Sequence, residues 1–278
     1  MSNNSELKYS VLMSIYFKEN PDFFRLAIDS MIHQTITPDE IVLVEDGPLT
    51  SELYDVIEEY VVKYPNLIQI ISFEKNLGLG LALNKGLEKC RNELVARMDT
   101  DDISRPDRCE LQLLFFMKNP ECSILGGQIE EFILSPDEVV GKRLVPETDA
   151  ELKCYIKKRC PFNHMTVMFK KTAVLEAGNY QDWFWNEDYF LWIRMALNNY
   201  FFANLPETLV KVRVGKEMYS RRGGEKYFKS EVAIQRLMLE KGMINRLTFF
   251  DNCLKRFILQ KMLPNTIRTW VFRYFARS

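Results

Sequence analysis

Apolar runs alternate with helix-like segments over the first 120 residues. Residues 9–17 (YSVLMSIYF) form a continuous apolar and β-branched run, which is typical of a strand buried on both faces. Residues 23–34 follow with apolar side chains at helical spacing. The alternation continues with strands expected at 39–44, 67–73 and 94–98 and helices at 51–63, 78–90 and 105–118. Four strand and helix repeats predict an α/β fold whose parallel strands are joined by right-handed crossovers.

The regular alternation ends after Pro120. We expect 123–134 to be a long strand or a strand pair with a bulge at its two glycines, and 201–214 to form two short strands around Leu205 and Pro206. Further helices are expected at 146–158, 186–199 and 230–242, and a short strand near 166–169. The second half therefore predicts a less regular layer beside the parallel sheet.

The composition is that of a globular protein with a large core. With 278 residues, 47% of them hydrophobic, one extended domain or two small ones are both possible. The polar first residues, MSNNSELK, contain no apolar signal segment, and no apolar run reaches membrane-spanning length. The six cysteines form no CxxC pair, so we interpret them as reduced core thiols of a cytosolic protein.

Positive charge is concentrated at the end of the chain. Residues 241–278 carry eight Lys or Arg against Asp251 alone, which makes this segment +7 and the preceding residues −8. Large apolar side chains are interspersed with these charges, a pattern typical of amphipathic helices that lie in a membrane interface. Packing against the main domain or against a second subunit is an alternative interpretation. Nucleic-acid binding is not expected, because the basic residues are mixed with apolar ones and the rest of the chain is acidic.

Three carboxylates crowd the end of the fourth predicted strand. Asp99, Asp101 and Asp102 directly follow its apolar residues, and ligands of open α/β sheets bind at the carboxyl ends of strands. Carboxylates this close repel one another unless a hard divalent cation lies between them. A solvated acidic turn that caps the next helix is the alternative. Asp46 ends the second strand in the same way, so the sequence is compatible with a nucleotide and a metal at one edge.

Glycines open the helix expected at 78–90. Gly78 and Gly80 would let the backbone approach a ligand closely, although neither GxGxxG nor GxxxxGK[ST] is present. Close packing of the helix explains them equally well.

Several later residues have both a structural and a functional interpretation. His164 is one of only two histidines and precedes a strand-like segment, where a structural role is favoured over a catalytic one. Glu187 and Asp188 open a helix whose dipole alone would favour them. The aromatic residues at 180–185 could belong to the core or form a sugar-stacking platform. The basic, glycine-containing segment 213–224 could hold a diphosphate or be a solvated loop.

Five segments in order and spacing resemble the inverting family 2 glycosyltransferases with a GT-A fold. They are SVLMSIYFKEN, IVLVEDGP, KNLGLGLALNKG, MDTDD as the DxD motif and NEDYFLWIR as the acceptor-side ED motif. Within that family, CPFNHMTVMFKK and VRVGKEMYSRRGG are most similar to bacterial transferases of capsule, exopolysaccharide or O-antigen synthesis, including amylovoran-type galactosyltransferases. The resemblance implies a Rossmann-like mixed sheet flanked by helices, with a C-terminal helical extension.

The resemblance also implies roles for individual residues. The nucleotide of a UDP-sugar would be bound by Tyr16, Glu19, Asp46, Asn76 and Asp99. Asp101 would bind Mn²⁺ or Mg²⁺ directly, with Asp99 beside it or contacting ribose, and Asp188 would be the catalytic base. The candidates for diphosphate or acceptor binding are His164, Glu187, Arg213, Arg221 and Arg222.

Two departures from the family pattern accompany these roles. Glu45 precedes Asp46 at the end of the second strand, where the family commonly has Asp-Asp. The histidine that often helps to bind metal in this family is missing from the segment VRVGKEMYSRR. We expect Arg221 and Arg222 to supply the missing positive charge.

These implications combine into one expected function. The chain would be a metal-dependent inverting glycosyltransferase that moves a hexose, such as galactose, from a UDP-sugar to a polyprenyl-diphosphate-linked saccharide at the inner face of the cell membrane. Residues 1–220 would form the catalytic domain, divided into a nucleotide half (1–120) and an acceptor half (121–220), and 221–278 the basic tail. The alternatives are a sugar nucleotidyltransferase, which needs a glycine- and Arg/Lys-rich signature that IYFKENPDF lacks, and a carbohydrate-binding protein without transferase activity.

Overall fold

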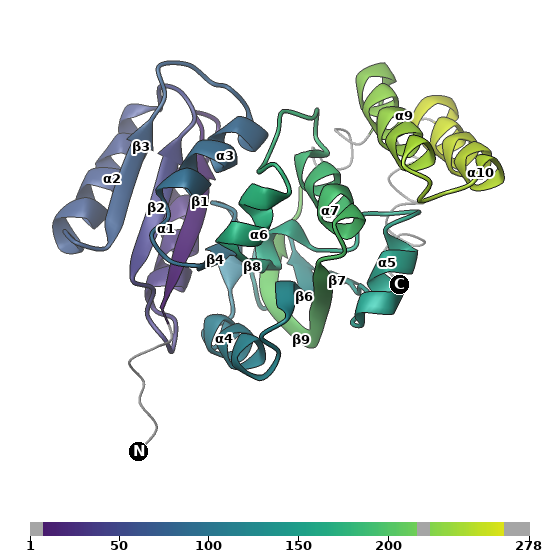
Figure 1. Cartoon of the computed structure of the whole chain (residues 1–278). Helices are drawn as coiled ribbons and strands as arrows, with labels where there is room; N and C mark the ends of the chain where they lie inside the picture. Colours follow the sequence, from purple (N-terminus) through teal and green to yellow (C-terminus); the bar gives the residue numbers. More distant parts are fainter. Residues whose placement is uncertain (1–7, 216–222, 264–278) are drawn as a thin grey trace.

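One mixed sheet forms the centre of the protein (Figure 1). The computed structural model describes residues 8–215 and 223–263. The parallel part contains β1 (Tyr9–Ile15), β2 (Glu40–Glu45), β3 (Ile68–Ser72) and β4 (Leu94–Arg97), in the order β3-β2-β1-β4. These are the four strands predicted from the apolar runs. Their carboxyl ends lie at one edge, because Ile15 pairs with Glu45 and Leu12 with Arg97.

Helices cover both faces of this sheet. Successive side chains of a strand point to opposite faces, so Val11 and Met13 of β1 pack toward α1 (Pro21–Ile32) and α2 (Ser51–Lys63), whereas Leu12 packs toward α3 (Leu79–Lys89). The helix α4 (Arg108–Lys118) lies on the same side as α1 and α2. The core is thus split into two apolar layers by the sheet.

Further strands, paired partly antiparallel and partly parallel, extend the sheet beyond β4. The added strands are β5 (Ile103–Ser104), β6 (Cys122–Phe132), β7 (Val139–Arg143), β8 (Met168–Lys170) and β9 (Phe201–Arg213). The helices of this half are α5 (Asp149–Tyr155), α6 (Lys171–Glu176) and α7 (Glu187–Leu197). β4 pairs antiparallel with β8, so the sheet is mixed, as the family resemblance implied.

The prediction of two short strands around Pro206 was wrong. β9 is one strand of 13 residues that runs beside β6 over almost its whole length. The register between them shifts after the pair Gly127 and Leu205, and pairing resumes at Gln128 and Thr208. Pro206 lies in this irregularity, where its missing N–H removes no ladder hydrogen bond. A bulge therefore accommodates the proline without interrupting the strand.

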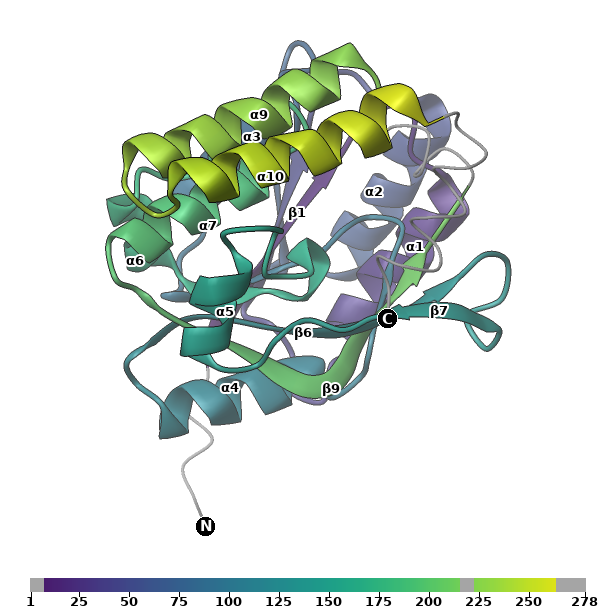
Figure 2. The ribbon, with the colours of Figure 1, turned by 90° about the vertical axis from the view of Figure 1, so that its right-hand side faces the viewer.

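Two long helices follow the sheet and lie side by side (Figure 2). They are α9 (Glu225–Glu240) and α10 (Arg246–Phe257), continued by a π-helical turn at Ile258–Met262. Buried polar groups join them to the body: the amide of Asn252 donates to Gln235 Oε1 at 2.8 Å and to the carbonyl of Lys157 at 2.9 Å. Arg256 pairs with Glu231, whose side chain is only 9% exposed. α10 is thus anchored by specific contacts.

Two predictions extend beyond this part of the chain. Residues 264–278 of the basic tail lie outside the described residues, and so does the domain boundary predicted at 220/221. Among the residues that the structure does describe, no helix combines the length and the apolar character needed to cross a membrane.

Candidate active site

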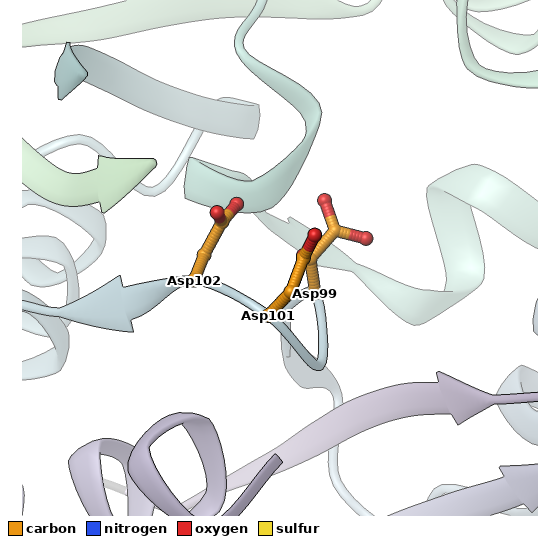
Figure 3. Close-up of side chains that lie close together, drawn as sticks. All are labelled: Asp99, Asp101 and Asp102. Atoms are coloured by element: carbon orange, nitrogen blue, oxygen red, sulfur yellow. The ribbon is translucent and has the colours of Figure 1, made fainter. Parts of the chain in front are cut away.

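The three carboxylates lie together on the turn between β4 and β5 (Figure 3). One oxygen of each of Asp99, Asp101 and Asp102 lies within 4.8 Å of the others. The turn is fixed at both ends, because the Met98 N–H donates to the carbonyl of Leu12 at 3.1 Å and Asp102 Oδ1 accepts from the Arg213 N–H at 2.9 Å. The expected cluster at a strand end is therefore present.

One buried arginine supplies positive charge to this cluster. Arg97 is 1% exposed and its Nη2 pairs with Asp99 Oδ1. Its Nε and Nη1 have no hydrogen-bond partner among the described residues. Buried donors are seldom left unpaired, so this guanidinium has hydrogen-bonding capacity that the described side chains do not satisfy.

Burial and mutual repulsion destabilise the charged forms of these carboxylates. Burial, followed by the charges of Asp99 and Glu19, raises the pKa of Asp101 to about 7. Burial and the charge of Asp101 raise the pKa of Asp102 well above its usual range. A bound divalent cation would relieve this repulsion, and clustered carboxylate oxygens are the donors that Mg²⁺ and Mn²⁺ prefer. The donor set thus fits the predicted cation.

The end of β2 forms a second part of the site, at the carboxyl edge of the parallel strands. Asp46 is 4% exposed, and its two carboxylate oxygens accept from the backbone N–H groups of Leu77 and Gly78 at 2.6 and 3.0 Å. The amide of Asn76 donates to the Asp46 carbonyl at 3.1 Å. Gly47 has φ +88°, and a Cβ there would lie 2.5 Å from the Asn76 nitrogen. Asp46 and Gly47 therefore hold the loop before α3 against the end of β2.

Glu19 connects the end of β1 to the carboxylate turn. Its Oε2 accepts from the Thr100 hydroxyl at 2.7 Å and its Oε1 from the Asn20 N–H at 3.0 Å. Burial raises the pKa of Glu19, and the nearby Asp99 adds to the shift. Tyr16 is half-buried, and its carbonyl accepts from the Glu19 N–H at 3.0 Å. The structure thus places Glu19 beside the cluster, with Tyr16 on the same turn after β1.

A second pair of carboxylates lies at the first turn of α7. Burial and the charge of Asp188 raise the pKa of Glu187 to about 7, and burial raises the pKa of Asp188. Asp188 Oδ1 accepts from the N–H of Tyr189 at 2.7 Å, and its Oδ2 accepts from the Cys160 thiol at 3.4 Å. Burial also raises the pKa of Cys160 well above its usual range, so this thiol is a donor.

The carboxylate cluster at 99–102 and the pair at 187–188 face the same region of the protein. Burial raises the pKa values of Asp101, Asp102, Glu187 and Asp188, and the positive charge of Arg97 opposes that rise at all four, so its guanidinium lies close enough to act on both groups. The start of α3 touches this region too, because a Cβ on Gly80 would lie 3.1 Å from Cβ of Glu187. The site therefore joins the edge of the parallel sheet to the start of α7.

The remaining predicted residues have varied surroundings. His164 Nε2 lies 3.0 Å from the Tyr180 hydroxyl, and burial with the charge of Arg97 lowers its pKa well below the usual value. A neutral imidazole among aromatic rings matches the structural interpretation.

Arg213 lies at the site: its Nε donates to the Asp101 carbonyl at 3.3 Å, and its guanidinium carbon lies 3.7 Å from the Phe23 ring centroid. Arg221 and Arg222 lie outside the described residues.

Sequence reasoning missed Arg97 and Cys160. Arg97 had a visible signal, since it is a charged residue inside an otherwise apolar strand that runs into three carboxylates. Cys160 had none, because its place beside Asp188 depends on contacts between distant parts of the chain.

Comparison with known proteins agrees with this fold and shows the family of the chain. The family model described as glycosyl transferase family 2 matches residues 10–178. An Escherichia coli relative named UDP-Gal:alpha-D-GlcNAc-diphosphoundecaprenol beta-1,3-galactosyltransferase is 39% identical over 97% of this chain and 97% of its own. The amylovoran biosynthesis glycosyltransferase AmsE of Erwinia amylovora is 42% identical over 87% of this chain and 91% of its own.

A solved structure supports the architecture. The S. aureus TarS 1-349 structure in complex with UDP-GlcNAc has a TM-score of 0.65 at 17% identity, over 90% of this chain and 72% of that one. At this identity the likeness establishes a shared fold. The chain belongs to glycosyltransferase family 2, and it is a transferase.

Proposed function

We propose that this protein is an inverting, cation-dependent hexosyltransferase that uses a UDP-sugar, with UDP-galactose as the first candidate, and extends a polyprenyl-diphosphate-linked saccharide. The observation that carries this proposal is the presence of the Asp99, Asp101 and Asp102 cluster and the half-buried Glu187 and Asp188 carboxylates within reach of the charge of Arg97. A cation site and a base are the two parts that a cation-dependent inverting transfer to a hydroxyl uses. The named activity of the E. coli relative supports this choice of donor and acceptor.

The donor would lie along the strand ends. Asp46, Tyr16 and Glu19 lie at the ends of β2 and β1, next to the loop that holds Asn76. In an open α/β sheet this edge is where nucleotides bind. We assign the nucleoside to these residues and to Asp99.

Asp101 would hold the cation directly. Asp99 is paired with Arg97, and Asp102 accepts from the Arg213 N–H, so Asp101 is the carboxylate best placed for a direct bond. When bound, Mn²⁺ or Mg²⁺ supplies positive charge to the diphosphate leaving group, an effect worth several kcal/mol. Arg213 is positioned to add further positive charge at the same turn.

Asp188 would act as the base on the acceptor side. The Cys160 thiol and the Tyr189 N–H orient its two oxygens, and burial raises its pKa toward the range useful for proton transfer. Asp188 would remove the proton from the acceptor hydroxyl as its oxygen bonds to the anomeric carbon, and the nucleoside diphosphate would leave that carbon from the opposite face. A positioned base contributes about 10²- to 10⁴-fold in rate.

The exposed face of α10 supports binding to a membrane surface. Leu247, Phe250 and Leu254 are 82%, 69% and 47% exposed, and their spacing places them on one side of the helix. Ile258 and Met262 continue this row and are 41% and 64% exposed. An apolar row on a helix in a basic segment fits burial among lipid headgroups, with anionic lipid attracting the Lys and Arg side chains. This location would be the cytoplasmic face of the cell membrane, where the lipid-linked acceptor is held.

A donor screen with defined variants tests the enzymatic proposal. Purified protein would be incubated with UDP- and GDP-sugars, Mn²⁺ and a synthetic GlcNAc-diphosphate-lipid, and nucleotide release and product linkage measured. We expect one UDP-hexose to react, with inverted anomeric configuration. EDTA and Asp101→Ala should each abolish turnover, and Asp188→Asn should remove most of it while UDP-sugar binding persists.

The exposed Asp55→Asn on α2 is the matched control and should retain full activity. Turnover in EDTA would contradict the cation role, and near-normal turnover by Asp188→Asn would contradict the base assignment. Sugar binding without transfer to any acceptor would support the carbohydrate-binding alternative.

A further inference from the structure

We propose that Trp185, stacked with Phe184 and backed by Tyr227 of α9, forms the platform on which the acceptor's terminal sugar ring lies. This inference rests on the proposed function and names a binding surface for its acceptor. The platform directly precedes the first turn of α7, since Trp185 is three residues before Asp188. A sugar on this platform would therefore be held next to the proposed base.

The backbone at Trp185 is in an unfavourable conformation. Its φ is 54°, in the left-handed region that bulky side chains rarely adopt. Glycine or asparagine would relieve the strain, so folding alone does not explain a tryptophan here. Strained conformations of this kind concentrate at ligand-binding sites, where the surrounding structure maintains them.

α9 holds the loop rigidly in this conformation. The Ser230 hydroxyl donates to the Phe184 carbonyl at 2.7 Å and accepts from the Asn186 amide at 3.1 Å. The indole N–H of Trp183 donates to the Ser230 carbonyl at 3.4 Å, and its ring lies 4.1 Å from that of Phe190. Trp183 and Asn186 thus anchor the loop, whereas the side chain of Trp185 is left 47% exposed.

The rings of this platform have the chemistry of a carbohydrate site. Trp185 and Phe184 stack with centroids 4.6 Å apart and an interplanar angle of 21°, and Tyr227 lies 6.2 Å from Trp185. Flat aromatic surfaces bind the C–H faces of sugar rings, and large rings kept in water without a partner are unfavourable. The donor positions lie at the ends of β1 and β2, so this second sugar surface fits the acceptor.

A basic group accompanies the platform. The ammonium nitrogen of Lys226 lies 4.0 Å from the Phe184 ring centroid, and its side chain is exposed. A ring surface beside a cation matches a sugar that carries a diphosphate at its reducing end. The acceptor expected from this surface is therefore a saccharide 1-diphosphate, with the sugar on the rings and the diphosphate toward Lys226.

Substitutions at Trp185 separate a binding role from a structural one. Trp185→Gly and Trp185→Asn both suit a positive φ, so their melting temperatures should equal or exceed that of the wild type. Both should raise the acceptor KM about tenfold, the equivalent of one lost stacking contact. Trp185→Tyr should recover most of this loss. Donor KM and the slow hydrolysis of UDP-sugar without acceptor should not change.

Lys226→Met provides a second test, which concerns the diphosphate of the acceptor. It should raise KM for a GlcNAc-diphosphate-lipid and leave KM for an uncharged GlcNAc glycoside unchanged, whereas Trp185→Gly should raise both. An unchanged acceptor KM in Trp185→Gly, with donor hydrolysis intact, would overturn the platform. If the wild-type protein itself hydrolyses no UDP-sugar, the proposed function is rejected instead. The two failures are therefore distinguishable.

Discussion

Replacing the exposed apolar side chains of α10 should release the protein from lipid while leaving its chemistry intact. The variant is Leu247→Ser, Phe250→Ser and Leu254→Ser, at positions that are 82%, 69% and 47% exposed. Fully burying a Leu or Phe side chain is worth about 1.5–3 kcal/mol, so complete immersion of these exposed fractions would contribute about 4 kcal/mol. Partition onto vesicles should then fall by up to ~10³-fold, and half immersion still predicts ~30-fold.

The assay is sedimentation with vesicles that contain anionic lipid, beside a transfer assay with a water-soluble acceptor. The matched control is Val62→Ser with Met117→Ser, which removes side chains that are 73% and 64% exposed on α2 and α4, away from α10 (Figure 1). The control should bind vesicles like the wild type. If the α10 variant also binds like the wild type, the row is not a lipid-binding surface. A change of sedimentation velocity in solution would indicate a contact with a second copy.

Point substitutions are a sharper test than deletion of the tail. Deleting everything after Lys241 would remove Asn252 and Arg256, whose partners Gln235 and Glu231 are buried in α9. α9 in turn holds the loop before α7 through Ser230. Loss of activity after truncation would therefore reflect damage to the site as well as loss of lipid binding.

Three further predictions concern the site itself. Glu187→Gln should shift the acid limb of the transfer rate, which arises because the base must be deprotonated, to lower pH, since Asp188 loses a neighbouring carboxylate that repels its charge; an unmoved limb in the kcat profile would contradict the coupling. Gly47→Ala should lower the free energy of unfolding by about 2 kcal/mol in urea titrations and weaken UDP-sugar binding, because its φ is +88° and a Cβ would clash with Asn76. Arg97→Met should cost about 3 kcal/mol of stability, because buried carboxylates lose their counter-charge, and added Mn²⁺ should restore part of it; equal stability without cation would refute this role.

Local patterns in the sequence were sufficient for the parallel half of the fold. The apolar runs at 9–17 and 39–44 are long enough to define buried strands, and the helix predicted at 51–63 matches α2 at both ends. Each of these elements is built from residues that are neighbours in the sequence, so hydrophobic periodicity alone predicts it. The carboxylates at 99–102 could be predicted for the same reason, because their place depends only on the strand that precedes them.

Tertiary contacts decided the rest. Pro206 should interrupt a strand by local rules, yet β9 runs through it because its partner β6 shifts register there. Cys160 and Asp188 are 28 residues apart, and the thiol becomes a partner of the carboxylate only when α7 packs beside the preceding segment. A chain's local preferences fix strands, helices and the residues at their ends, whereas pairing between distant segments determines which of those residues meet.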